Sequence, residues 1–137
     1  MQRIIVAKEL AKFFGLLAHP LRIRIVEELG TRELTVGELK EKLDTPQALI
    51  SQHLAILRNG KLVLERREGR HVYYHVRKPE LAKIILDCTA FVEPDIETSE
   101  DIIKAIKSAK AAWQKKDKKK NKTSTIIKIL TMTTNYS

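Results

Sequence analysis

Residues 35–76 read TVGELKEKLDTPQALISQHLAILRNGKLVLERREGRHVYYHV, and this stretch decides the fold. Apolar residues recur at helical spacing in its first half, which predicts two short helices over residues 36–43 and 46–58. The second half is rich in β-branched and aromatic residues around a Glu-Gly turn, which predicts two strands over residues 62–67 and 70–76. A helix pair followed by a basic hairpin is typical of a helix that lies in a DNA groove beside a wing.

Polar residues mark where the two helices are expected to begin. Thr35 and Glu38 have the spacing of a capping box, in which each side chain satisfies a free backbone donor. Thr45 is expected to cap the second helix, with Pro46 at its first helical position. Very few residues then remain between the helices, so they must cross sharply.

Further helices are expected on both sides of this stretch. Residues 2–18 and 20–29 repeat apolar groups at helical spacing, and His19 between them is expected to cap a neighbouring backbone group. Residues 80–93 follow Pro79 and carry another apolar series. The sequence therefore predicts a mainly α-helical fold with one small β-hairpin.

The chain of 137 residues is long enough for one domain and an additional arm. We expect a domain over residues 1–94, an extra helix within residues 95–114, and a basic tail without regular structure over residues 115–137. Residues 107–137 hold nine lysines and one acid, whereas the preceding 106 residues have a net charge of +1. The formal charge of +9 thus belongs to the tail and does not by itself indicate DNA binding by the domain.

Composition also excludes several classes of protein. The one cysteine, Cys88, excludes an intramolecular disulfide and a zinc site built from several cysteines of one chain. Charged residues interrupt the apolar residues near the N-terminus, and no apolar run approaches the roughly 18–20 residues of a membrane span. Without a nucleophile–base motif, a phosphate loop or a metal cluster, we expect a cytoplasmic protein that is not an enzyme and binds no cofactor or membrane.

Side chains of the second helix and of the hairpin suit a DNA groove. Base edges in the major groove are read by side chains that donate and accept hydrogen bonds, and Gln47, Ser51 and Gln52 offer this chemistry on a helix whose other side is apolar. The first helical turn offers N–H groups to a phosphate, and flexible cations at the hairpin suit the DNA backbone. The predicted DNA-binding residues are Thr45, Gln47, Ser51, Gln52, His53, Arg58, Arg66, Arg67 and Arg70.

Some of these residues also have a purely structural interpretation. His53 lies beside Leu54, where a histidine is often a half-buried packing residue, and both interpretations stay open. The three hairpin arginines would by themselves suit a solvated turn balanced by Glu65 and Glu68. Their position directly after the helix pair favours the interpretation as a DNA contact.

Four segments occur in a familiar order. LLAHPLRIRIVEEL is followed by LTVGELKEKL, PQALISQHLAILRNGKLV and EGRHVYYHV, which together resemble the ArsR/SmtB family of winged helix-turn-helix transcription repressors over roughly residues 8–92. The resemblance implies a homodimer in which the first and last helices of the domain pack together, with two recognition helices at half-sites about 34 Å apart on double-stranded DNA. The interface residues that it implies are Leu10, Phe14, Leu17, Leu81, Ile84, Ile85, Cys88 and Phe91.

Many members of this family sense metals, but this chain lacks the residues. One type of metal site in the family needs a pair of cysteine thiolates in the third helix, where this sequence has Thr35 and Gly37. Another type of metal site needs a histidine in the last helix, which has Glu80, Asp87 and Glu93 instead. We therefore expect no metal site, while a small-molecule or redox effector stays open.

Cys88 and two histidines have several possible roles. Cys88 could pair with its symmetry mate, react with an oxidant or join an intersubunit site, but a small apolar residue buried in the dimer seam is the expected role. His71 and His75 share one strand face without a third ligand nearby, so we expect wing or surface residues.

Two functions compete on these observations. The leading hypothesis is a sequence-specific DNA-binding repressor without catalytic activity. The alternative is a protein- or RNA-interaction module that uses the lysine-rich C-terminal arm, since clustered lysines attract acidic partners without selectivity.

Overall fold

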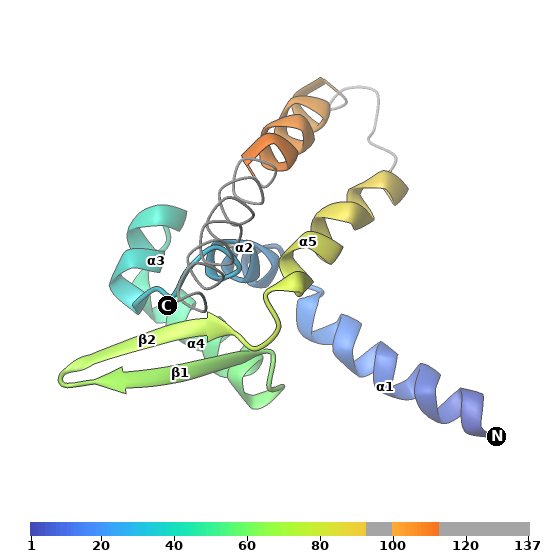
Figure 1. Cartoon of the computed structure of the whole chain (residues 1–137), viewed down its shortest axis with the longest axis horizontal. Helices are drawn as coiled ribbons and strands as arrows, with labels where there is room; N and C mark the ends of the chain where they lie inside the picture. The colour runs from blue at the N-terminus through green and yellow to red at the C-terminus, as the bar shows by residue number, and fades with distance from the viewer. Residues whose placement is uncertain (93–99, 113–137) are drawn as a thin grey trace, which may run out of the picture. The chain divides into compact units, whose positions relative to one another are not determined.

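A computed structural model describes residues 1–92 and 100–112 of the chain, which divides into two units, residues 1–85 and 86–137. The second unit contains the end of α5, a 3-10 turn, η1 (Cys88–Phe91), and a helix over residues 100–112. The predicted basic tail lies outside the described residues. The first unit contains α1 (Gln2–Leu17), α2 (Pro20–Leu29), α3 (Val36–Leu43), α4 (Gln47–Asn59), β1 (Val63–Glu68), β2 (His71–Val76) and most of α5 (Glu80–Asp87) (Figure 1).

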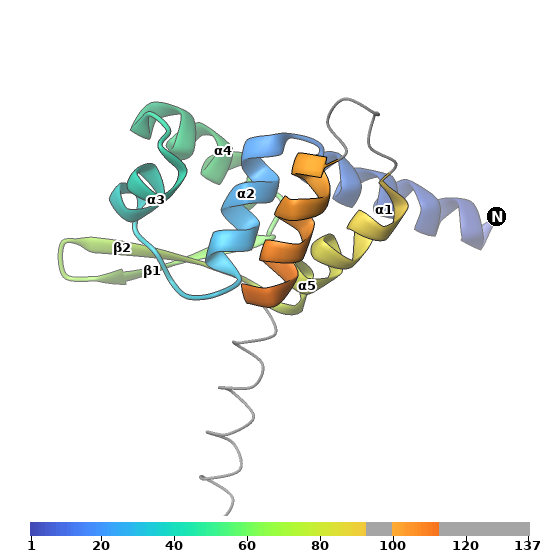
Figure 2. The ribbon, with the colours of Figure 1, turned by 90° about the horizontal axis from the view of Figure 1, so that it is seen from above.

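One apolar core joins every element of the first unit. Each helix contributes apolar residues from its buried side. The strands contribute Val63 at the start of β1 and Val76 at the end of β2. The hairpin extends from this core as a two-stranded arm, with α3 and α4 next to it (Figure 2). The predicted mainly helical fold with one hairpin is therefore confirmed. The core residues are Leu17, Ile25, Val26, Leu29, Leu34, Leu39, Ile50, Leu54, Leu57, Val63, Val76 and Leu81.

Two predicted helix caps are confirmed. The Glu38 N–H donates to the Thr35 hydroxyl at 3.2 Å, and the Thr35 N–H donates to the Glu38 carboxylate at 2.8 Å, which completes the capping box of α3. The Leu21 N–H donates to Nδ1 of His19 at 3.1 Å, so this ring caps α2. Local sequence thus sets where both helices begin.

The hairpin is antiparallel, with a register that runs from Val63 opposite Val76 to Glu68 opposite His71. Both strands begin one residue later than predicted, so the turn is formed by residues 69 and 70. Gly69, the first residue of this turn, has a φ of +58°. Two-residue hairpin turns of this type place a glycine with positive φ at their first position.

The base of the hairpin is tied to the loop between α2 and α3. The Leu34 N–H donates to the Tyr74 carbonyl at 3.1 Å, and the Tyr74 N–H donates back at 2.8 Å. Leu34 is also fully buried, which fixes the strands against the core.

The last predicted helix is shorter than residues 80–93. α5 ends at Asp87, and the turn η1 follows. The Thr89 hydroxyl donates to the Leu86 carbonyl at 2.6 Å, and such a bond competes with regular helix continuation. None of the helices in the described part of the chain is long and apolar enough to span a bilayer.

α4 ends where it approaches α1. A Cβ on Gly60 would lie 2.3 Å from a methyl carbon of Leu16, so a glycine lets the two helices meet closely. The left-handed position that ends many helices then falls on Lys61, which has a φ of 60°. This geometry places a lysine at the junction of α4 and β1.

α2 ends in a still closer contact with α5. A Cβ on Gly30 would lie 2.4 Å from the Cβ of Ala82, and neither atom belongs to a flexible side chain. We expect Gly30→Ala to lower the free energy of unfolding by about 1–3 kcal/mol, measured by urea denaturation, because the helices must move apart. Gly15→Ala is the control, because no atom lies within 4 Å of that position, and it should raise stability by about 0.5–1 kcal/mol. Equal losses in both variants would contradict the steric explanation.

Candidate nucleic-acid interface

α4 has one buried side and one exposed polar side. Ile50 and Leu57 are fully buried, whereas Gln47, Ser51 and Gln52 are exposed. Ser51 lies four positions after Gln47, so their side chains lie on the same side of the helix, whereas Gln52 lies roughly 100° further round its exposed surface. All three residues predicted to read bases therefore face solvent.

Leu49 is an exception among the apolar residues of α4, because 43% of it is exposed. α4 packs through a narrow stripe that runs through Ile50, Leu54 and Leu57, and Leu49 lies at the edge of that stripe. An apolar side chain thus borders the polar surface of α4.

Thr45 does not cap α4 as predicted. Its hydroxyl donates to the Leu43 carbonyl at 2.8 Å, and Pro46 takes the cap position instead. The cause is the tight connection, in which Asp44 adopts a left-handed conformation with φ 46° and turns the chain back over the end of α3. Because no side chain caps α4, the N–H groups of Gln47 and Ala48 are available to an anion, whereas the Leu49 N–H donates to the Pro46 carbonyl.

His53 lies inside the molecule, which corrects its prediction as a DNA contact. Only 9% of the residue is exposed, and its ring stacks on His19 with centroids 4.2 Å apart. Its Nδ1 is buried and has no hydrogen-bond partner within the described residues. Of the two interpretations that the sequence left open, packing is correct, and His53 joins α4 to the α1–α2 junction.

The burial of His53 gives folding a pH dependence. Burial lowers its pKa below the usual 6.5, and the nearby charges of His19 and Arg22 lower that pKa further. Below about pH 6.5 the unfolded chain therefore binds a proton that the folded chain resists, so stability falls as the pH decreases towards the lowered pKa. We expect urea denaturation to show falling stability between pH 7.5 and 5.5 in the wild type and a flatter profile in His53→Gln. The exposed His71→Gln variant should keep the wild-type slope, and a flat wild-type profile would contradict the interpretation.

Arg66 on β1 is held by two carboxylates. Its guanidinium donates to Glu33 at 2.8–3.2 Å and to Glu68 at 2.8 Å, and it lies 4.8 Å from the centre of the Tyr73 ring. The hydrogen bond with Glu33 raises the pKa of Arg66 and lowers the pKa of Glu33. Arg66 therefore ties the hairpin to the α2–α3 loop, and its bond with Glu68 is of the kind that the structural interpretation of the hairpin arginines gave.

The other three arginines differ in how firmly they are paired. Arg58 at the end of α4 donates to Glu65 at 3.0 Å, and Arg67 lies 3.7 Å from the same carboxylate with 76% of its side chain exposed. Arg70 lies in the turn of the hairpin and has no ion-pair partner among residues 1–92 and 100–112. Because exposed ion pairs stabilise folding weakly, phosphate groups can replace the carboxylates of Arg58 and Arg67.

Two residues at this surface escaped the sequence analysis. Glu33 lies 33 positions before Arg66, so no local pattern connects the two. Lys40 is exposed beside a shallow hollow between α3 and α4, which Thr45, Pro46 and Gln47 also line. Lys40 was detectable, because it follows the buried Leu39 on a helix whose other side faces solvent.

The exposed side of α1 is apolar. Val6, Leu10 and Phe14 follow one another at intervals of four, and each is 49–59% exposed. Ile84 of α5 is also 57% exposed. A soluble chain rarely exposes so many large apolar side chains on one helix, so this surface is a candidate for burial against another molecule.

The other five predicted interface residues lie elsewhere. Leu17 and Leu81 belong to the core of their own unit, which removes them from any exposed interface, and Ile85 is half-buried against that core. In the second unit, Cys88 and Phe91 are exposed. Helical spacing identified an apolar side correctly but did not show which of its residues face the chain's own core.

Histidines and carboxylates do not form a metal centre in residues 1–92 and 100–112, where no group of three or more potential ligands is found. Nδ1 of His75 lies 3.7 Å from Glu33, next to the Arg66 ion pair, and His71 is exposed near the turn. Their positions are those of hairpin and surface residues.

Comparisons with known proteins agree on one family. A model described as a helix-turn-helix domain matches residues 17–66. The Biofilm growth-associated repressor of Agrobacterium fabrum is 38% identical over 79 residues, which are 58% of this chain and 68% of that protein. The HTH-type transcriptional repressor SmtB of Mycobacterium tuberculosis is 43% identical over 79 residues, which are 58% of each chain.

Solved structures show the same fold. Reduced HlyU from Vibrio cholerae matches with a TM-score of 0.59 and 29% identity, over 68% of this chain and 98% of that one. A homodimeric winged helix-turn-helix DNA-binding domain from Mycobacterium bovis, a possible ArsR-family transcriptional regulator, matches with a TM-score of 0.57 and 23% identity, over 66% of this chain and 83% of that one. With helices, hairpin and relatives in agreement, the chain belongs to the ArsR/SmtB family of winged helix-turn-helix transcriptional regulators.

Proposed function

We propose that this protein is a homodimeric repressor that binds double-stranded DNA in a sequence-specific manner. The observation that carries the proposal is the exposed polar side of α4, where Gln47, Ser51 and Gln52 face solvent beside an uncapped helix N-terminus. In the proposed complex these side chains read base edges in the major groove, while the N–H groups of the first turn hold a phosphate.

The hairpin supplies contacts that do not depend on sequence. Arg67 and Arg70 lie at or near its turn, and their guanidinium groups are assigned to the DNA backbone or the neighbouring minor groove. Arg58 is assigned to a phosphate at the other end of α4. Arg66 keeps its position against Glu33 and holds the hairpin at the angle from which the other arginines reach the DNA.

Dimerisation through α1 and α5 is the second part of the proposal. It would bury the exposed apolar side chains of Val6, Leu10, Phe14 and Ile84, which otherwise stay in water. The Mycobacterium bovis structure, described as homodimeric, supports this assembly by its fold. A twofold dimer presents two α4 helices to half-sites about 34 Å apart, which makes a palindromic operator the expected target. Binding to chromosomal DNA would also imply a cytoplasmic location.

Footprinting on genomic fragments tests sequence-specific binding. We expect one or a few protected sites with inverted repeats, and an excess of random DNA should not compete for them. Salt-dependent binding without preference among fragments would contradict the proposal, because phosphate contacts alone produce that behaviour.

The lysine-rich tail supports the alternative function and needs its own control. Replacing Lys115, Lys116, Lys118, Lys119 and Lys120 with glutamine removes five charges without shortening the chain. If the winged domain reads DNA, operator preference should survive with a shallower dependence of affinity on salt. Loss of all nucleic-acid binding in this variant would favour an interaction module that acts through the arm.

A further inference from the structure

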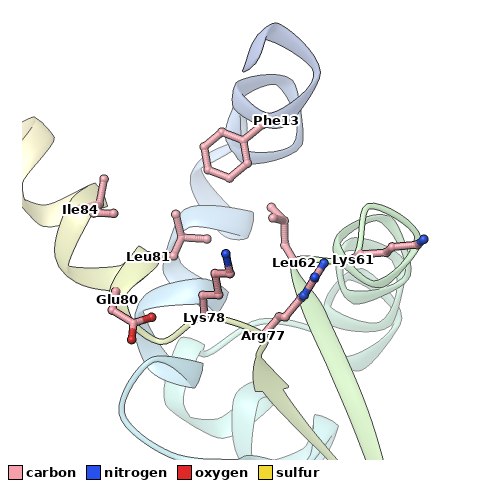
Figure 3. Close-up of a pocket in the computed structure, with 8 residues that line it drawn as sticks. All are labelled: Phe13, Lys61, Leu62, Arg77, Lys78, Glu80, Leu81 and Ile84. Carbon is pink, nitrogen blue, oxygen red and sulfur yellow. The ribbon is translucent and has the colours of Figure 1, made fainter. Parts of the chain in front are cut away.

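A pocket of about 350 Å³ opens in the first unit between α1, the α4–β1 junction and the start of α5 (Figure 3). Apolar side chains from three separate segments line it: Phe13 of α1, Leu62 before β1, and Leu81 and Ile84 of α5. The Phe13 ring, Leu62 and Leu81 point towards one another across the hollow. The volume lies within the range of roughly 300–1,000 Å³ that is usual for small-molecule sites.

Basic side chains stand at the opening of this apolar pocket. Arg77 and Lys78 extend towards Leu62 and Leu81, whereas the ammonium group of Lys61 points away from the hollow (Figure 3). The one acid of the lining, Glu80, directs its carboxylate away from Phe13. The lining therefore carries three positive charges and one negative charge.

The charged groups of this pocket lack partners in the described part of the chain. No ion pair or side-chain hydrogen bond joins Arg77, Lys78, Lys61 or Glu80 to a residue there. Arg58 and Arg66, in contrast, are each paired with glutamates. Two unpaired cations beside an apolar hollow offer complementary charge to an anion that carries an apolar tail.

We propose that this pocket binds an apolar carboxylic acid of the fatty-acid type. Its carboxylate is held by Arg77 and Lys78, because a guanidinium donates two parallel hydrogen bonds to a carboxylate and an ammonium adds a second charge. Its hydrocarbon chain lies against Phe13, Leu62 and Leu81, where it leaves water.

A second copy of the chain covers the edge of the pocket at Ile84, which is assigned to the dimer, but it is a less suitable occupant of the hollow itself. The exposed side of α1 that is available for self-association presents Val6, Leu10 and Phe14, all apolar. Packing that surface into the pocket would take Arg77 and Lys78 out of water without supplying an acid, which is unfavourable. A small amphiphilic acid satisfies both the apolar walls and the cations.

The position of the pocket links it to DNA binding, a step that rests on the proposed function. Lys61 and Leu62 directly follow α4, and Phe13 lies on α1, whose exposed side is assigned to the dimer. A bound acid therefore contacts both the segment that follows the recognition helix and the dimerisation helix. We expect such an acid to change operator affinity, and by linkage the operator should change the affinity for the acid by the same factor.

Isothermal titration calorimetry of the full chain with decanoate tests the site. Decanoate should bind, butyrate should bind far more weakly at about fourfold per methylene lost, and decanol should bind more weakly than decanoate. Arg77→Gln and Lys78→Gln should each weaken decanoate binding about tenfold or more and leave decanol binding unchanged. Lys83→Gln is the matched control, because Lys83 is an exposed lysine of α5 outside the lining.

Several outcomes would overturn the proposal. Equal binding of decanoate and decanol, or equal losses in Lys78→Gln and Lys83→Gln, would show nonspecific partitioning onto the apolar surface. Decanoate binding that appears only when the protein is diluted to monomers would assign the pocket to a second copy. Circular dichroism of each variant checks that the fold is retained.

Operator titrations with and without decanoate distinguish a failure of the regulatory link from a failure of the proposed DNA-binding function. A change in operator affinity of threefold or more supports the regulatory link. Unchanged operator affinity with decanoate bound contradicts that link and leaves the site intact. Absence of operator binding both with and without decanoate would instead contradict the proposed function.

Discussion

Replacing Phe14 with glutamate should leave the protein monomeric and cut operator affinity by about 100-fold or more. Phe14 is 59% exposed on α1 and packs edge-on against Phe13, with ring centroids 5.3 Å apart. In a twofold interface the substitution places a carboxylate without a partner on both copies. Burying an unpaired charge costs about 3–5 kcal/mol, which exceeds what one lost aromatic contact would remove. A monomer contacts one half-site alone, so the two recognition helices no longer act together.

Sedimentation equilibrium and operator titration on the same samples measure this effect. Ala11→Glu is the matched control, because Ala11 is exposed on α1, away from the stripe through Leu10 and Phe14, and the change in charge is the same. The control should stay dimeric and bind the operator. A monomeric wild type that binds its operator, or equal disruption by Ala11→Glu, would contradict dimerisation through this side of α1.

Much of the fold was predictable because its signals are local. The capping box of Thr35 and Glu38 and the apolar spacing of α2 to α4 depend on residues a few positions apart. His19 was recognised as a junction residue for the same reason. The predicted start of α4 is wrong by one residue because the Thr45 hydroxyl donates to the Leu43 carbonyl instead of capping α4. The predicted starts of both strands are wrong by one residue because the turn is formed by residues 69 and 70.

Contacts between distant residues were not predictable. Arg66 and Glu33 meet because the hairpin folds back to the α2–α3 loop, and a sequence pattern carries no sign of that approach. Burial has the same limit, since spacing shows that Leu17 and Leu10 share a side of α1 but not that Leu17 enters the core. The pocket beside Phe13 likewise combines three segments that lie far apart in the sequence.

Substitutions in α4 and in the hairpin should differ in how they change affinity for operator DNA and for random DNA. Gln47→Ala and Ser51→Ala should each lower operator affinity by about 1–3 kcal/mol and leave affinity for random DNA nearly unchanged, because a base contact is lost. Arg67→Ala should weaken both kinds of DNA by a similar factor and reduce the salt dependence of binding by about one phosphate contact. All three side chains are exposed, so folding should be unaffected.

Competition titrations at two or more salt concentrations distinguish these effects. If Gln47→Ala and Ser51→Ala lose equal affinity for operator and random DNA, their side chains contact phosphates and the assigned direct base readout is wrong. If Arg67→Ala changes the preferred sequence, the hairpin itself reads bases or groove shape. In that case, the polar side of α4 would serve to position the hairpin on the DNA, and the hairpin would carry the sequence preference.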